Sequence, residues 1–245
     1  MRINVEIEPT SKKDKIIEFA SSVKAYINEI NVPDNPLGQP KASALAIAIF
    51  LKNLGLKPVP HIKAADRNFY AIKSEILGAY YLFDIDSFLI VRGDTNSYTK
   101  DEIYNKYKLE TIVNKIKQDE KLSVIKIGLP LMNYQHIEER IFERINSKAN
   151  FLVLPQIMNV KELNEELLKL IKNHGKELHA YYLIETENNK SFLYELGLIK
   201  GNEIRTTEEH VETILEFEDY VDTLILSCPK DIKSLVNILT RIYKK

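Results

Sequence analysis

The stretch "KPVPHIKAADRNFYAIKSEILGAYYLFDIDSFLIVRGD", from Lys57 to Asp94, contains two apolar runs of strand length with one longer segment between them. The runs "KPVPHI" and "SFLIVRG" have the composition of buried strands. A strand, a helix and a second strand in this order are the repeating unit of a parallel α/β fold. The number of times this unit recurs along the chain therefore decides the fold.

Apolar runs of strand length recur along the whole chain. Six more are "INVEIE" near Ile3, "AYINEI" near Ala25, "LSVIKIGL" near Leu122, "FLVLPQI" near Phe151, "LHAYYLIE" near Leu178 and "DTLILSC" near Asp222. Between the runs, apolar residues follow helical spacing, as at Ile16, Phe19, Ala20 and Val23. Eight strands alternating with helices in 245 residues predict one α/β domain over residues 1–245, a single (β/α)8 TIM barrel.

Composition narrows the classes of partner. The chain has 34 Lys and Arg against 35 Asp and Glu, so it lacks the positive charge that a nucleic-acid backbone attracts. No apolar run approaches the roughly 18 residues of a membrane span, so we expect a cytoplasmic protein without a membrane partner. The lone Cys228 cannot form an internal disulfide and has no neighbours at zinc-ligand spacing. We therefore expect no metal site and interpret Cys228 as a small buried apolar residue.

Polar residues end several of the predicted strands, where a barrel places its working groups. In the first strand Val5 alternates with Glu6, so Glu6 faces the barrel mouth if Val5 faces the helices. The other strand-end residues of this kind are His61, Arg92, Asp94 and Gln156. Together they predict a polar ring that contains a carboxylate.

Each of these residues also has a structural interpretation. Glu6 could be an exposed strand carboxylate, and His61 could be a hydrogen-bonded residue of the core or rim. The sequence "RGD" at Arg92 to Asp94 could form a turn with an exposed ion pair. The residues alone predict a carboxylate-bearing barrel mouth and name no substrate.

The stretch from Val32 to Asp94 resembles the methylenetetrahydrofolate reductase family. The resemblance lies in the "DNP" loop, the "PHIKAADRN" strand-to-helix junction, "LGA" in the third helix and "RGD" after the fourth strand. Outside that stretch, "VEIEP" from Val5 and "PQ" at Pro155 resemble the ends of the family's first and sixth strands. The resemblance implies a flavin-containing barrel of one-carbon metabolism that reduces a methylene-tetrahydropterin to its methyl form.

The resemblance also implies roles for individual residues. Glu6 corresponds to the general acid that assists opening of the methylene bridge. Asp94 corresponds to a catalytic aspartate beside both the flavin ring and the pterin, and Gln156 to a glutamine that hydrogen-bonds the substrate. The remaining correspondences are all to residues around the flavin, and they are His61, Arg92, Gly93, Tyr107 and Arg144. The implied cofactors are FAD rather than FMN, with NADH or NADPH as reductant.

Two other functions stay open from the sequence. One is a flavin-free barrel that binds a pterin, or an accessory subunit in methyl transfer. The other is a different barrel enzyme that uses the same mouth. A homo-oligomer or a partner subunit is compatible with each, because barrel enzymes often associate.

Overall fold

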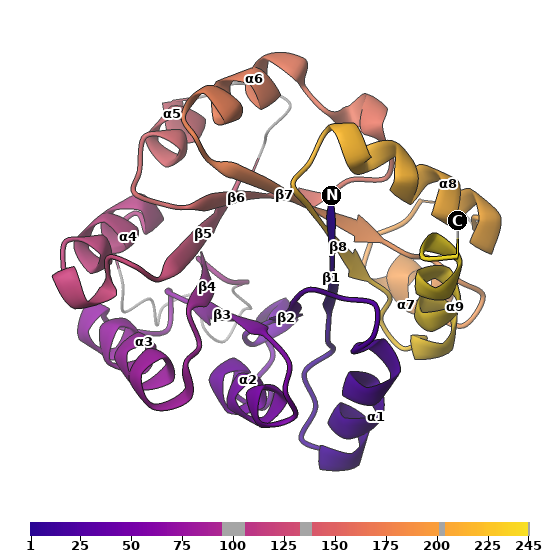
Figure 1. Cartoon of the computed structure of the whole chain (residues 1–245), viewed down its shortest axis with the longest axis horizontal. Coiled ribbons are helices and arrows are strands. Elements are labelled where there is room, and N and C mark those ends of the chain that lie inside the picture. The colour runs from indigo at the N-terminus through magenta and orange to yellow at the C-terminus, as the bar shows by residue number, and fades with distance from the viewer. Residues whose placement is uncertain (95–105, 133–138, 201–203, 245) are drawn as a thin grey trace.

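The computed structural model describes residues 1–94, 106–132, 139–200 and 204–244. Eight parallel strands form one closed barrel in the order of the sequence, and the helices surround it (Figure 1). The predicted (β/α)8 barrel is therefore confirmed. The strands are β1 Arg2–Glu6, β2 Ile30–Val32, β3 Pro58–Lys63, β4 Ser87–Val91, β5 Lys126–Pro130, β6 Phe151–Gln156, β7 Glu177–Leu183 and β8 Thr223–Ser227.

Helices follow the strands along the chain. They are α1 Lys13–Val23, α2 Ala44–Asn53, α3 Phe69–Phe83, α4 Leu109–Lys117, α5 Glu139–Ile145, α6 Glu165–Asn173, α7 Lys190–Glu195, α8 Thr207–Glu216 and α9 Ile232–Ile242. Short 3-10 turns are η1 Pro36–Gly38, η2 Glu120–Leu122, η3 Val160–Glu162 and η4 Phe217–Asp219. None of the described helices combines the length and the apolar character that crossing a lipid bilayer requires.

The predicted second strand was misplaced. It was expected at "AYINEI" near Ala25, but β2 begins at Ile30, and Tyr26 lies in the turn that follows α1. β2 is the segment Ile-Asn-Val, and all three residues are buried; with only two apolar residues it is too short to stand out as an apolar run. The adjacent Tyr26 and Ile27 of "AYINEI" instead pack on the core from outside the sheet.

Apolar residues fill two regions of the molecule. The larger cluster lies between the strands and the helices and includes Val5, Ile90 and Cys228, the last only 7% exposed. A smaller cluster inside the barrel contains Val59, Leu89, Phe151, Val153 and Ile225. This packed interior makes the barrel a solid core, so a ligand site has to lie at one end.

A polar network closes the N-terminal end of the barrel. The Arg2 guanidinium contacts the Glu177 carboxylate at 2.5 Å and donates to the Thr223 hydroxyl at 3.1 Å. His179 lies 3.2 Å from the same carboxylate and stacks on Phe151. The network joins β1, β7 and β8, so it ties the first strand to the last two.

Candidate active site at the barrel mouth

Glu6 occupies the end of β1 and points into the barrel. The neighbouring Val5 is fully buried in the outer core, so the alternation of the strand directs Glu6 to the interior. The Ser227 hydroxyl at the end of β8 donates to Glu6 Oε1 at 2.9 Å. Burial raises the pKa of Glu6, although hydrogen bonds from Ser227 and Tyr181 partly oppose the shift. Glu6 as a residue is partly exposed and is the last residue of β1, which places it on the floor of the mouth.

Tyr181 on β7 contacts His61 on β3. Its hydroxyl lies 3.1 Å from His61 Nε2, and the charge of Glu6 adds to the effect of burial in raising the pKa of Tyr181. The residue was missed at the sequence level, where "LHAYYLIE" was interpreted only as a strand. Alternation was the available signal, because Tyr181 and Tyr182 must face opposite sides of β7.

His61 lies inside the barrel and is 7% exposed. Its Nε2 is 3.4 Å from Asn31 Oδ1 as well as close to the Tyr181 hydroxyl. Burial lowers the pKa of His61 to about 3, so the imidazole is neutral at physiological pH. The structure therefore gives His61 two polar partners within the protein, Tyr181 and Asn31.

The "DNP" loop is held by the "PHIKAADRN" junction. The Asp34 carboxylate accepts from the Lys63 amide at 2.9 Å and forms an ion pair with Arg67 at 2.7 Å. Arg67 in turn contacts Glu75 of α3 at 3.0 Å. Both motifs thus have a structural function, since they fix the loop against the start of α3.

Asp94 and Gly93 complete the contact between this loop and β4. Asp94 is exposed, and its Oδ2 accepts from the Leu37 amide at 2.8 Å. Gly93 has φ +86°, and a Cβ there would lie 2.2 Å from Cγ of the buried Lys63. Glycine is therefore required for backbone conformation and for space, whatever ligand the rim binds.

Arg92, Tyr107 and Arg144 form a separate group on the rim. Arg92 Nη2 donates to the Tyr107 carbonyl at 3.1 Å. Arg144 on α5 pairs with Glu110 on α4 at 2.8 Å, while its buried Nη1 has no described partner. Burial lowers the pKa of Arg144, Glu110 opposes this shift, and nearby Arg140 and Arg92 add to it. Among the described hydrogen bonds, none joins this group to Glu6.

Gln156 ends β6, one strand from Tyr181 in the register of the sheet. Its Nε2 donates to the Leu198 carbonyl at 2.9 Å and lies 3.3 Å from the sulfur of Met158. Gln156 thus contacts the β7–β8 connection, a contact that the strand pattern alone could not predict.

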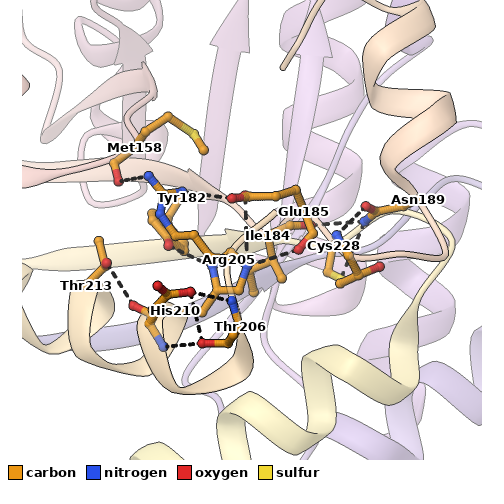
Figure 2. A network of polar contacts seen from close by, with 12 residues as sticks. Met158, Tyr182, Ile184, Glu185, Asn189, Arg205, Thr206, His210, Thr213 and Cys228 are labelled. Atoms are coloured by element: carbon orange, nitrogen blue, oxygen red, sulfur yellow. Dashed lines mark hydrogen bonds and ion pairs between the residues drawn. The ribbon is translucent and has the colours of Figure 1, made fainter. Parts of the chain in front are cut away.

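A second buried network supports the same connection (Figure 2). Arg205 pairs with Glu185 at 3.0 Å and also donates to the Met158 carbonyl at 3.2 Å. His210 Nε2 is 3.0 Å from the Glu185 carbonyl, and its Nδ1 is 2.8 Å from the Tyr182 hydroxyl. These contacts fit a neutral histidine that donates through Nε2 and accepts through Nδ1. The network anchors α8 to β7 on the outside of the barrel.

Two surface hollows, of about 270 and 200 Å³, lie beside α8. They are lined mainly by exposed charged side chains such as Glu209, Glu212 and Arg241, and contain none of the strand-end residues. Chemistry in a parallel barrel occurs at the C-terminal ends of the strands. The strand ends around Glu6, rather than these hollows, therefore define the candidate site.

Fold and site together define a parallel barrel with a partly buried glutamate, Glu6, on the floor of its mouth. No protein-family model and no curated protein sequence matches the chain. Among solved structures, the chain is similar to an uncharacterized protein from Clostridium thermocellum that binds two copies of 5-methyl-5,6,7,8-tetrahydrofolic acid. The match has a TM-score of 0.67 and 15% sequence identity, and it covers 100% of this chain and 96% of that chain.

Enzymes are also among the solved structures that share the fold. Phosphoribosyl anthranilate isomerase from Thermococcus kodakaraensis matches with a TM-score of 0.53 and 12% identity, over 100% of this chain and 99% of that one. The spore cortex-lytic enzyme SleL from Bacillus cereus matches with a TM-score of 0.63 and 7% identity, over 98% of this chain and 74% of that one. At these identities the likeness establishes the barrel fold and leaves the activity to be argued from the site.

Proposed function

We propose that this barrel binds a reduced pterin in its mouth and reduces a 5,10-methylene-tetrahydropterin to the 5-methyl form. The observation that carries the proposal is Glu6, a partly exposed residue at the end of β1 whose carboxyl pKa is raised by burial. A carboxyl group in such a place keeps its proton closer to neutral pH and can donate it to a bound substrate. The Clostridium thermocellum protein supports a tetrahydrofolate as the class of ligand.

The roles of the surrounding residues follow from their contacts. Ser227 holds Glu6 Oε1 at 2.9 Å, so the carboxyl group is fixed in orientation. Glu6 would protonate the pterin nitrogen as the methylene bridge opens, which leaves an electrophilic carbon ready for hydride. Asp94 has an exposed carboxylate on the rim, where it can accept hydrogen bonds from pterin N–H groups.

A flavin would supply the hydride that no side chain can supply. The rim partly fits such a cofactor, because Arg144 has a buried Nη1 without a described partner and Arg92 lies near enough to influence its pKa. Two guanidinium groups at one place suit a phosphate. In this proposal Arg92 and Arg144 hold the phosphates of FAD, and NADH or NADPH is the reductant.

One observation favours the alternative of a flavin-free pterin-binding barrel. His61, which the family resemblance places beside the flavin, is 7% exposed and its Nε2 already faces Tyr181 and Asn31. In that arrangement the histidine hydrogen-bonds residues inside the barrel and does not face a cofactor on the rim. A direct flavin titration separates the two functions.

The test is binding of 5-methyltetrahydrofolate by isothermal titration calorimetry, with Glu6→Gln and Asp94→Asn compared with wild type. Glu8→Gln is the matched control, because Glu8 is exposed just beyond the same strand. We expect saturable binding by wild type, Glu8→Gln and Glu6→Gln, and weaker binding by Asp94→Asn. Absence of saturable binding by wild type would overturn the pterin assignment. Titration with FAD and with FMN then decides between the flavin-dependent reductase and the flavin-free barrel.

A further inference from the structure

The side chain of Tyr181 reaches across the inside of the barrel. It leaves β7, and its hydroxyl lies 3.1 Å from Nε2 of His61 on β3. In the closed ring of eight strands, β3 and β7 are four strands apart in either direction, so they face each other across the barrel axis. The two side-chain rings meet edge to face, with centroids 6.4 Å apart and planes at 90°. The phenol ring therefore lies across the barrel interior.

Tyr181 is covered from below and accessible from above. It packs on the smaller apolar cluster inside the barrel, in which every residue is at most 3% exposed. Tyr181 itself is partly exposed, whereas the adjacent Tyr182 is fully buried in the outer core. The cluster fills the space below the ring, so the exposed part of Tyr181 is reached from the mouth.

His61 holds the ring in this position. Burial lowers the pKa of His61 to about 3, so the imidazole is neutral at physiological pH. Burial raises the pKa of Tyr181, and the charge of Glu6 adds to this shift, so the phenol keeps its proton. A hydroxyl can donate to or accept from either tautomer of a neutral imidazole. The contact between the two side chains is therefore maintained across the physiological pH range.

A fixed aromatic ring with one accessible side is a surface for a flat ligand. Tyrosine offers a large rigid contact area at low cost in side-chain entropy, and aromatic rings pack favourably when they are stacked with an offset. The pyrimidine ring of a reduced pterin is flat and suits such a contact. Glu6 comes from β1, which only β8 separates from β7, and Ser227 of β8 holds its carboxyl group at 2.9 Å. A pterin that rests on Tyr181 thus has the proposed acid beside it.

We propose that Tyr181 is a ligand-binding residue whose ring forms part of the floor of the mouth and stacks against the pterin. His61 is then a positioning residue, because it holds the Tyr181 hydroxyl from the opposite wall. This gives the buried histidine a function with or without a flavin. The inference rests on the proposed function, since it specifies how the proposed pterin lies in the mouth.

The test is titration of the protein with 5-methyltetrahydrofolate by isothermal titration calorimetry, using two variants of Tyr181. Tyr181→Phe keeps the ring and removes the hydroxyl, whereas Tyr181→Leu stays apolar and removes the ring. We expect Tyr181→Leu to bind about 10- to 100-fold more weakly, the range for loss of one stacked aromatic contact, and Tyr181→Phe to lose less. Tyr182→Phe is the matched control, because the Tyr182 hydroxyl contacts His210 outside the barrel, and it should bind like wild type.

A second measurement follows the accessibility of position 181 directly. The chain contains no tryptophan, so Tyr181→Trp introduces a single fluorescent reporter at the proposed floor. Acrylamide should quench its fluorescence in the free protein, and 5-methyltetrahydrofolate should protect it. Tyr81→Trp is the control, because Tyr81 is 55% exposed near the C-terminal end of α3, away from the mouth. Its quenching should not change when the ligand is added.

The possible failures give different results. Thermal unfolding first establishes that each variant is folded, and the protection of Tyr181→Trp decides if Tyr181→Leu does not fold. The stacking assignment is overturned, and the proposed function survives, if wild type binds and Tyr181→Leu binds equally tightly. The same conclusion follows if bound ligand leaves the quenching of Tyr181→Trp unchanged. Absence of binding by wild type overturns the pterin assignment, and stacking of a pterin on Tyr181 with it.

Discussion

At the scale of single residues, burial of the Glu6 carboxyl group disfavours its ionised form in the folded protein. In the proposed reaction the same group donates a proton to the substrate. Glu6→Gln keeps the hydrogen bond from Ser227 and removes the proton that the substrate would take. We expect reoxidation of reduced flavin by methylenetetrahydrofolate to slow by about 10²- to 10⁴-fold, the range for loss of a general acid. Flavin reduction by NADH or NADPH, followed separately by stopped flow, should stay within a few-fold of wild type.

The control for this kinetic prediction is Glu8→Gln, which removes an exposed carboxylate beyond the same strand. It should leave both half-reactions unchanged. Equal losses in the two half-reactions of Glu6→Gln would show that Glu6 acts through the structure of the site. An unchanged rate in both would remove it from the mechanism.

Two glycines offer a matched test of backbone strain. Gly93 has φ +86° and its added Cβ would lie 2.2 Å from Lys63 Cγ, whereas Gly78 in α3 has no atom within 4 Å of such a Cβ. We expect Gly93→Ala to lower the free energy of unfolding by about 1–3 kcal/mol, and Gly78→Ala to raise it by up to about 1 kcal/mol. Urea denaturation measures both values. Similar values for the two variants would contradict the role assigned to Gly93.

Residue-level inference from the sequence succeeded where a side chain follows from strand alternation. The interior position of Glu6 followed from Val5, because neighbours in a strand face opposite sides. Tyr181 was accessible to the same reasoning but lies in a run that also contains Tyr182, and the sequence does not say which tyrosine faces inward. The link between Tyr181 and His61 joins residues 120 positions apart, so only the closed barrel reveals it.

At the scale of elements, the loop between β2 and α2 depends on the start of α3. Asp34 is almost fully buried and pairs with Arg67, whose side chain is 18% exposed. Arg67→Ala leaves the Asp34 carboxylate buried without its cation, and we expect a loss of roughly 3 kcal/mol in the free energy of unfolding. Arg241→Ala removes one partner of the exposed pair with Glu208 and should change stability by less than about 0.5 kcal/mol. Equal effects would show that the loop is held by other contacts.

The order of the elements could be predicted because each strand–helix unit has a local signature. The boundaries were less accessible, as the shift of β2 to Ile30 shows. The three residues of β2 include only two apolar ones, which is too few to stand out, while Tyr26 and Ile27 just before β2 have the composition of a strand. The loops at the mouth were not predictable in detail, because Asp34 and Gln156 are positioned by partners distant in the sequence.

At the scale of the whole molecule, two carboxyl groups lie at opposite ends of the barrel with opposite pKa shifts. Burial raises the pKa of Glu6 above 4.5 at the mouth. At the closed end, a hydrogen bond with His179, assisted by Arg2, lowers the pKa of Glu177 from 4.5 to about 2. The mouth of the barrel thus disfavours the ionised form of Glu6, whereas the N-terminal end favours the ionised form of Glu177. In such barrels the mouth carries the catalytic residues and the N-terminal end contributes to stability.

This asymmetry predicts two pH dependences of opposite sign. Glu6 has a folded pKa above its unfolded value, so wild type loses stability as pH rises from about 4.5 through the folded pKa. Glu6→Gln should therefore raise Tm relative to wild type at pH 8, and the gain should vanish below pH 4.5.

Glu177 has a folded pKa of about 2, so its contribution to stability is complete above pH 4.5 and disappears as pH falls through 2. Glu177→Gln should lower Tm at pH 8 by an amount that shrinks under acid conditions. Thermal unfolding of wild type and both variants between pH 3 and 8 measures these differences, and a Glu6→Gln variant less stable than wild type at pH 8 would show that the mouth stabilises the ionised carboxylate.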